Sequence, residues 1–206
     1  YRIRNPKPPL ERLFLFPATA TSFYRYDRGL QKVYATKLSL KERRHIKKAF
    51  HRAFEILRYE HPKKTYGELI EDRGTQVTFS VFGQDAVKVL GIKRGVALKT
   101  EWARKNGALK MKIARTVQKL LPELEVHAAG FTSIDVTRKG IDKAYGLRQI
   151  KKYVRVDIED MAFIGDAIFP GGNDYAVVRT GIDYVPVLGP EQTKKVIRAI
   201  LKQKKG

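Results

Sequence analysis

The sequence predicts an α/β protein in which antiparallel strands and helices precede a parallel α/β layer. Two observations predict this fold class. The middle of the chain combines alternating, β-branched segments with strongly amphipathic helical ones. After residue 138, strand-like segments alternate with helical segments, which is the order typical of a parallel sheet covered by helices.

The N-terminal part predicts strands followed by a helix. On both sides of the turn Asp27-Arg28-Gly29, residue types alternate along the chain as they do in strands, which indicates a β-hairpin. Ser39 with Glu42 three residues later forms a capping box, and apolar residues recur behind it at helical spacing. We therefore expect strands at 12–19, 22–27 and 31–37, and a helix ending near residue 58.

The remaining elements are expected from the same signals. Segment 66–83 holds enough β-formers for two strands, and a second helix should run from Trp102 to Leu121, where Pro122 ends it. Asp142 can cap a further helix, and Pro190 can open a last one that buries Val196, Ile197, Ile200 and Leu201. The other expected segments are strands at 123–130, 132–137, 161–165 and 183–189, and a short helix at 175–180. The run 161–165 is continuously apolar, which is typical of a strand covered on both faces.

Composition excludes several classes of protein. Forty-three per cent of the 206 residues are hydrophobic, enough for a core, and the absence of cysteine excludes disulfides and thiolate chemistry. No apolar run approaches the roughly 20 residues that span a bilayer, so we expect a cytoplasmic protein. The formal net charge of +21 fits either a nucleic-acid partner or an enzyme for anionic substrates with a basic surface.

The segment FIGDAIFPGGNDY, residues 163–175, predicts a cation site. Asp166 should lie at the carboxyl end of the strand 161–165, where ligands bind in open α/β sheets. Glycines let the loop turn tightly and bring Asn173 and Asp174 back beside Asp166. Oxygen ligands of this kind suit Mg²⁺, which keeps waters and substrate phosphate oxygens in its shell. The alternative is a surface turn whose Asp and Asn cap the next helix.

The same segment also carries a family resemblance. GDAIFPGGNDY resembles the fourth motif of the haloacid dehalogenase (HAD) superfamily, in its phosphomannomutase-like, class IIB branch, and DVTRKGIDKAYG resembles the approach to its third motif. The similarity covers residues from about 13 to 201. It implies a partial Rossmann-like HAD core with a parallel sheet, and an inserted α+β cap of antiparallel strands and two helices. The implied divisions are a core remnant at 1–26, the cap at 27–137 and the C-terminal half of the core at 138–206.

The resemblance also implies roles for individual residues. Lys143 matches the lysine that opens a helix and reaches the phosphate, and Asp166, Asn173 and Asp174 match the metal site, with Mg²⁺ as cofactor. Arg73, Ser133 and Asp135 match cap positions that contact the substrate. Each has a plainer alternative: a solvated lysine in a first helical turn, a surface ion pair for Arg73, and outward residues of an edge strand for Ser133 and Asp135. Gln84 stands where phosphomannomutases have a second arginine.

One part of the family pattern is absent. The family's nucleophile is the first aspartate of an Asp-x-Asp motif, but no two of the ten aspartates here lie two residues apart. The resemblance therefore places the nucleophile upstream of Tyr1. Because losing a nucleophile costs several powers of ten in rate, residues 1–206 alone are expected to be inactive or nearly so. A core without its first strands should also expose apolar surface, which could make the chain a homo-oligomer.

The sequence thus supports three functions. The first is a Mg²⁺-dependent phosphatase of small phosphorylated metabolites, such as sugar phosphates, that works through an aspartyl-phosphate. The second is a phosphomutase, which Gln84 disfavours because a mutase must bind two phosphates in succession. The third is a non-catalytic basic module that binds nucleic acid or another polyanion.

Overall fold

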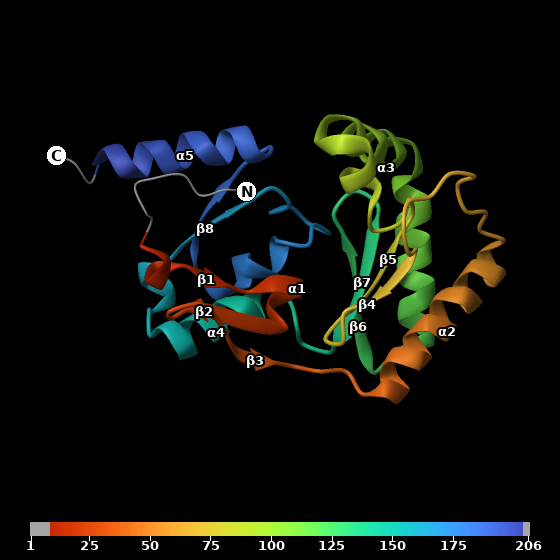
Figure 1. The fold of residues 1–206 in the computed structure, drawn as a ribbon, viewed down its shortest axis with the longest axis horizontal. Helices are drawn as coiled ribbons and strands as arrows, with labels where there is room; N and C mark the ends of the chain where they lie inside the picture. The colour runs from red at the N-terminus through yellow and green to blue at the C-terminus, as the bar shows by residue number, and fades with distance from the viewer. Residues whose placement is uncertain (1–8, 204–206) are drawn as a thin grey trace. The chain divides into compact units, whose positions relative to one another are not determined.

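The computed structural model of the protein describes residues 9–203. The chain divides into two compact units, Tyr1–Ile141 and Asp142–Gly206. The first unit holds three-stranded and four-stranded antiparallel sheets, and the second holds a two-stranded parallel sheet. The α/β fold class is therefore confirmed, with the parallel sheet after residue 138 (Figure 1).

The predicted hairpin at the start of the first unit is confirmed. Strand β2 (Ser22–Tyr26) pairs with β3 (Leu30–Ala35), and the turn between them closes by a 2.8 Å bond from the Asp27 N–H to the Gly29 carbonyl. The 3₁₀ turn η1 (Leu10–Arg12) precedes this sheet. The expected strand 12–19 is wrong in extent, since β1 covers only Phe14–Leu15. Pro17 cannot donate to a ladder, and it opens the turn α1 (Pro17–Ala20).

Helix α2 (Leu40–Leu57) begins at the predicted capping box. The Glu42 N–H donates to Ser39 Oγ at 3.1 Å, and the Ser39 N–H donates to Glu42 Oε2 at 2.5 Å. Two orphan N–H groups of the first turn are thereby satisfied. The predicted apolar stripe is confirmed, since Ile46, Ala49, Phe50, Ala53 and Phe54 are all buried.

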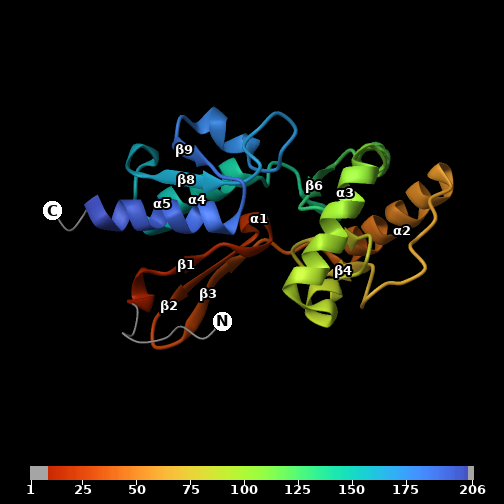
Figure 2. The ribbon, with the colours of Figure 1, turned by 90° about the horizontal axis from the view of Figure 1, so that it is seen from above.

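The four-stranded sheet has the order β4–β5–β7–β6. Helices α2 and α3 cover its apolar face, where Val77, Phe79, Ile134 and Val136 are almost fully buried (Figure 1, Figure 2). The opposite face carries polar side chains, among them Thr78 and Asp135. This alternation follows from the period of two along a strand. The strands are β4 (Ile70–Asp72), β5 (Val77–Ser80), β6 (Leu124–Ala129) and β7 (Ser133–Arg138).

Helix α3 (Ala86–Leu120) begins well before the predicted start at Trp102. Gly91, with φ 77° and ψ 160°, breaks its axis, and Asn106 breaks it again. The first turn packs back so closely that a Cβ on Gly95 would lie 2.7 Å from Val87 Cα. Glycines at 91 and 95 weaken the helical pattern in the sequence, although they are what allows this packing.

The second unit pairs β8 (Ala162–Gly165) with β9 (Asp183–Pro186) in parallel. Leu147, Val177 and Ile182 form its small core. Figure 2 shows α4 and α5 alongside the two strands. The predicted helices and strands are confirmed here as α4 (Lys143–Val154), η3 (Tyr175–Thr180), α5 (Pro190–Gln203), β8 and β9, with an additional 3₁₀ turn η2 (Ile158–Asp160).

Several apolar side chains of the second unit are more exposed than the sequence predicts. Ile197, Ile200 and Leu201 of α5 were expected to be buried, but their side chains are exposed, and in β8 Ala162 is exposed while Phe163 and Ile164 are half-buried. The described sheet has only two strands, so it offers too little area to cover these apolar faces. Exposed apolar surface is therefore present as expected, and association into a homo-oligomer stays a prediction.

Candidate active site

Lys143 is the first residue of α4, and neighbouring residues fix the start of this helix. Asp142 caps the helix, since its Oδ1 accepts from the Tyr145 N–H at 2.8 Å, and its Oδ2 pairs with Arg179. The Lys143 ammonium lies 3.6 Å from Asp174 Oδ1. Since a cation at a helix N-terminus opposes the helix dipole, the Asp174 carboxylate supplies the charge that compensates it.

Asp174 is the buried acid of the site, with 5% of the residue exposed. Its Oδ2 accepts from the Ala167 N–H at 3.3 Å, and its own N–H donates to the Ala167 carbonyl at 3.3 Å. The loop after β8 therefore folds back onto its own beginning. Desolvation makes a buried carboxylate costly unless it is paired, and Lys143 provides the counter-charge.

Glycines make this return of the loop sterically feasible. A Cβ on Gly165 would lie 2.6 Å from Asp174 Oδ2, and one on Gly172 would lie 2.1 Å from the Ala167 carbonyl oxygen. Gly171 has φ 87°, a conformation that residues with a Cβ rarely adopt. The PGG sequence at 170–172 is thus a consequence of how closely the backbone approaches itself.

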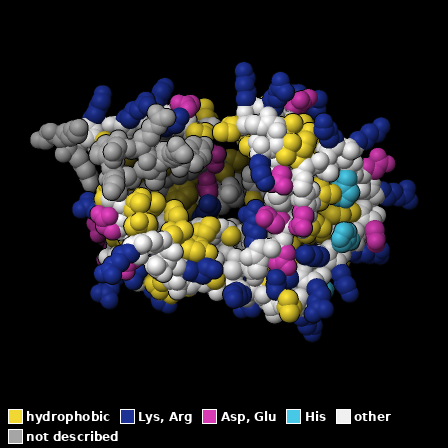
Figure 3. Space-filling model, viewed as in Figure 1, with side chains coloured by type: hydrophobic (Ala, Val, Ile, Leu, Met, Phe, Trp, Pro, Cys, Tyr) yellow, Lys and Arg dark blue, Asp and Glu magenta, His cyan; other side chains and the backbone are white. Residues whose placement is uncertain are grey.

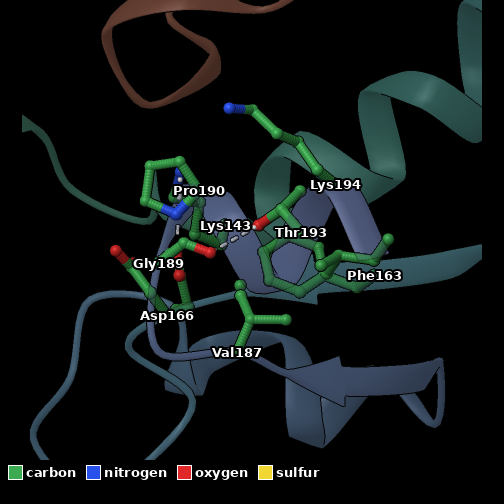
Figure 4. A pocket seen from close by; sticks show the side chains of 11 residues that line it. Lys143, Phe163, Asp166, Val187, Gly189, Pro190, Thr193 and Lys194 are labelled. Atoms are coloured by element: carbon green, nitrogen blue, oxygen red, sulfur yellow. Dashed lines mark hydrogen bonds and ion pairs between the residues drawn. The ribbon is translucent and has the colours of Figure 1, made fainter. Parts of the chain in front are cut away.

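Lys143, Asp166 and Asp174 line one pocket of about 580 Å³. Figure 4 shows Lys143 and Asp166 near Gly189 at one end of this pocket, with Phe163 and Val187 along its wall. Asp166 follows β8 directly, so the pocket opens at the carboxyl end of a parallel strand. Asn173 is half-buried in the same loop but does not line the pocket.

Two polar side chains of the pocket were not predicted from the sequence as site residues. Thr193 and Lys194 come from the first turns of α5, where Thr193 Oγ1 donates to the Gly189 carbonyl at 3.2 Å and Lys194 pairs with Glu191. Pro190 marks the start of α5 in the sequence. No pattern in the sequence indicates that the first turns of α5 lie beside β8.

The donor set of the pocket fits a hard cation that shares its shell with a phosphate. Asp166 and Asp174 are its two carboxylates. Within residues 9–203 no group of three His, Cys, Asp or Glu side chains is suitably placed to hold a metal. One or two carboxylates completed by waters and substrate oxygens is a typical shell for Mg²⁺, whereas a closed structural site needs more protein ligands.

Ser133 and Asp135 lie two residues apart in β7, on the polar face of the four-stranded sheet. Asp135 Oδ1 accepts from Thr78 Oγ1 at 2.8 Å, and Thr78 accepts in turn from Gln76 Nε2 at 2.8 Å. Burial raises the pKa of the Asp135 carboxyl, and the Thr78 hydrogen bond and nearby cations, Arg73 among them, oppose this rise. Asp135 thus belongs to a polar network with Thr78 and Gln76, and Ser133 lies on the same face of the sheet.

Arg73 follows β4, where its Nε donates to Glu71 Oε2 at 2.6 Å. Its side chain also lines a second cavity in the first unit, which neither Ser133 nor Asp135 lines. The Gln84 amide donates to the Thr78 carbonyl at 3.2 Å. The Gln84 side chain therefore binds the backbone of β5, and because it is neutral it supplies no cation for a phosphate.

The pocket thus combines a lysine and two carboxylates at the carboxyl end of a parallel strand, where ligands bind in open α/β sheets. The chain is similar in fold to the IMP-bound, N-terminally truncated IMP-nucleotidase of Plasmodium falciparum, with a TM-score of 0.61 and 13% identity over 94% of this chain and 49% of that one. A further structure of IMP-nucleotidase from the same organism gives a TM-score of 0.55 and 12% identity, covering 90% of this chain and 43% of that one.

The family model of eukaryotic phosphomannomutase matches residues 60–203, and the chain belongs to this family. A phosphomannomutase of Encephalitozoon cuniculi (strain GB-M1) is 37% identical over 75 residues, which are 36% of this chain and 28% of that protein. The chain therefore spans about a quarter of this curated relative and about half of the solved structures it matches.

Proposed function

We propose that this chain supplies the cap and the C-terminal part of the core of a Mg²⁺-dependent phosphatase. Its substrates would be small phosphorylated metabolites, sugar phosphates in particular. The observation that carries the proposal is the convergence of Lys143, Asp166 and Asp174 on one pocket. Phosphoryl transfer consists largely of positioning and charge neutralisation, and this pocket combines a cation for phosphate with carboxylates for a metal.

Each polar residue of the pocket would have its own role. Lys143 would hold an oxygen of the transferred phosphoryl group, and Asp174 orients Lys143 through their 3.6 Å ion pair. Asp166, supported by Asn173 and Asp174, would hold Mg²⁺. When bound, Mg²⁺ neutralises charge on phosphoryl oxygens. Phe163 and Val187 line the wall of the pocket with apolar surface.

Arg73, Ser133 and Asp135 would contact the substrate. Family membership supports both a phosphatase and a phosphomutase. A mutase has to bind two phosphates in turn, and the Gln84 amide, which donates to the Thr78 carbonyl, offers no second cation. This contact favours the phosphatase over the mutase.

The nucleophile would come from outside residues 1–206, since the sequence contains no Asp-x-Asp. Under this proposal the attacking aspartate would lie outside residues 1–206, and residues 1–206 alone would be inactive or nearly so. A cytoplasmic location stays a prediction. Within residues 9–203 no helix is both long and apolar enough to cross a bilayer.

Coupled binding of Mg²⁺ and inorganic phosphate tests the proposal. We expect phosphate to tighten Mg²⁺ binding in calorimetric titrations, because the ion would share its shell with phosphate oxygens. Asp166→Asn should weaken Mg²⁺ binding at least about tenfold, since it removes the charged ligand at the pocket. Asp183→Asn, an exposed acid at the start of β9, is the matched control and should leave binding unchanged. Equal Mg²⁺ affinity of Asp166→Asn and the unsubstituted chain would overturn the metal role of Asp166.

A second function is favoured by the charge of the helical face. Helix α2 carries six Lys or Arg and two Glu, and α3 carries ten Lys or Arg and one Glu. Their net charges, +4 and +9, make up 13 of the 21 net positive charges of the chain. Both helices lie on one face of the four-stranded sheet, and Figure 3 shows many Lys and Arg side chains over this part of the molecule. We propose this helical face as a candidate surface for nucleic acid.

Salt dependence tests this second function. Lys41 and Lys48 are exposed on α2 and lie on the same side of the helix as Arg44. If this face contacts phosphates, the double variant Lys41→Gln, Lys48→Gln should lower the slope of log affinity for duplex DNA against log salt by about 2. Lys195→Gln, exposed in α5, should leave that slope unchanged. Fluorescence anisotropy over a salt series measures both, and a slope unaffected by the double variant would contradict a role for α2.

A further inference from the structure

The first unit contains a second cavity, of about 270 Å³, whose lining is strongly basic. Lys32 of β3 and Lys37 after it contribute from one side, and Arg43 of α2 and Arg73 after β4 from the other. Its lining includes no carboxylate, and it shares no residue with the pocket around Lys143. Lys32 and Lys37 are exposed, so water solvates part of this charge, and the concentration of four cations at one concave site favours an anionic ligand.

Internal acids offset only part of this charge. Arg43 Nη1 donates to both oxygens of Asp72, at 3.2 and 3.3 Å, but Asp72 also faces the Lys47 ammonium at 3.8 Å. Arg73 pairs with Glu71 at 2.6 Å. Among the described residues, neither Lys32 nor Lys37 has an acidic partner. Two unneutralised ammonium groups therefore remain at the cavity.

Two hydroxyl side chains complete the lining on the buried side, since Ser22 and Thr75 are 6% and 7% exposed. Thr21 Oγ1 lies 2.8 Å from both the Ala18 carbonyl oxygen and Thr75 Oγ1. Because the single Thr21 proton goes to the carbonyl, the Thr75 hydroxyl donates to Thr21, and Ser22 is the hydroxyl donor left for the cavity. The guanidinium Nε of Arg43 is buried and, within residues 9–203, has no hydrogen-bond acceptor. This donor can be satisfied by a water molecule or by a bound anion.

The walls of the cavity are tied together by the backbone. The Leu38 N–H donates to the Gly74 carbonyl at 2.8 Å, which joins the segment after β3 to the turn between β4 and β5. The Gly74 N–H donates to Asp72 Oδ1 at 3.0 Å and thereby fixes the turn that carries Arg73 and Thr75. Lys32 lies over the ring of Tyr24, 5.5 Å from its centroid. The backbone that carries Arg73 and Thr75 is thus fixed, whereas the Lys32 and Lys37 side chains are exposed.

We propose that this cavity binds a small phosphate-type oxyanion, either free phosphate or the phosphate of a small metabolite. Lysine, arginine and hydroxyl donors on several sides match the tetrahedral oxygens of phosphate. The size is near the lower end, about 300 Å³, of ordinary small-molecule sites, which leaves space for one phosphate and a small attached group. The proposal goes beyond the phosphatase function, because the transferred phosphoryl group would lie at Lys143. Arg73 is a candidate for both sites, so the test avoids it.

Titration with inorganic phosphate, followed by NMR at the backbone amides of 73–75, tests the proposal. We expect these amides to shift saturably, and the double variant Lys32→Gln, Lys37→Gln to weaken that binding at least about tenfold through loss of two charge-assisted contacts. The control Lys63→Gln, Lys195→Gln removes the same charge from exposed sites outside the cavity and should change the affinity less than about twofold. Unchanged melting temperatures of both variants would show that the fold is intact.

Three further outcomes separate the sources of the phosphate and the two sites. Saturation by inorganic phosphate supports free phosphate, and saturation only by glycerol phosphate supports a phosphorylated metabolite. Shifts caused only by an oligonucleotide would overturn the small-anion proposal and assign the cavity to the polyanion surface. The response at 73–75 should persist in Lys143→Met, so a failure at one site is distinguishable from a failure at the other. Equal phosphate affinity of the Lys32, Lys37 variant and its control would overturn the proposal.

Discussion

Lys143→Met is expected to weaken phosphate binding in the pocket after β8 by roughly 10- to 100-fold, which corresponds to the loss of one hydrogen bond between charged groups. The ammonium of Lys143 lines the pocket and lies 3.6 Å from Asp174. Methionine keeps the length and apolar stem of lysine but removes the charge. The measurement is a phosphate titration followed by NMR at the amides of residues 165–174.

The same substitution should also lower the free energy of unfolding. The Asp174 side chain is only 7% exposed. Without Lys143 its carboxylate stays buried, and among the described residues the Ala167 N–H is the remaining hydrogen-bond donor to it. An uncompensated buried acid costs about 1–3 kcal/mol. Lys143→Arg keeps the charge and should restore part of both losses.

Lys152→Met is the matched control for Lys143. Lys152 lies in the last turn of the same helix, exposed, with its ammonium 5.2 Å from the Tyr153 ring centroid. We expect this variant to bind phosphate like the unsubstituted chain. If Lys143→Met and Lys152→Met bind phosphate with equal affinity, Lys143 has no role in holding phosphate.

Gly172→Ala is expected to lower the stability of the second unit by about 2–4 kcal/mol and to abolish phosphate binding at Lys143. Its Cβ would lie 2.1 Å from the Ala167 carbonyl oxygen and 3.1 Å from that of Phe169. Both are backbone atoms, so no rotamer change relieves the contact. The Ala167 carbonyl accepts from the Asp174 N–H, and its displacement would move Asp174 away from Lys143. Thermal or urea denaturation measures the loss of stability.

Gly171→Ala, one residue earlier in the loop, separates steric contact from backbone conformation. A Cβ on Gly171 would meet nothing within 4 Å, but the residue has φ 87°. This variant should lose only the conformational preference of glycine, about 1–2 kcal/mol, and should keep the Lys143–Asp174 pair and phosphate binding. Equal destabilisation by the two alanines would contradict the close approach of Gly172 to the Ala167 carbonyl.

Local signals predicted most elements of the fold because they act within a few residues. The Ser39–Glu42 capping box begins α2, the turn at Asp27 joins β2 and β3, and Asp142 caps α4. Prediction failed where a distant contact stabilises an unfavourable local sequence. The first half of α3 contains Gly91 and Gly95, and only the approach of Val87 to Gly95 accounts for the latter.

The candidate site was predictable as a motif but not as a geometry. The loop 165–174 indicated a phosphate and metal site through its acids and glycines, and the match to the eukaryotic phosphomannomutase family accords with that resemblance. The roles of Lys143, Asp166, Asn173, Asp174, Arg73, Ser133 and Asp135 remain predictions, and Lys143→Met and Asp166→Asn test the first two directly.

The sequence by itself determined the α/β fold class, the order of the elements and the glycines that the loop requires. These properties follow from hydrophobic periodicity, capping and allowed backbone angles, which each residue carries wherever it is packed. Only the tertiary structure decided that Lys143 pairs with Asp174, that the start of α5 lines their pocket, and that Arg73 joins three other cations around a separate cavity. Such pairings depend on how elements pack across long sequence separations, and no local pattern encodes that packing.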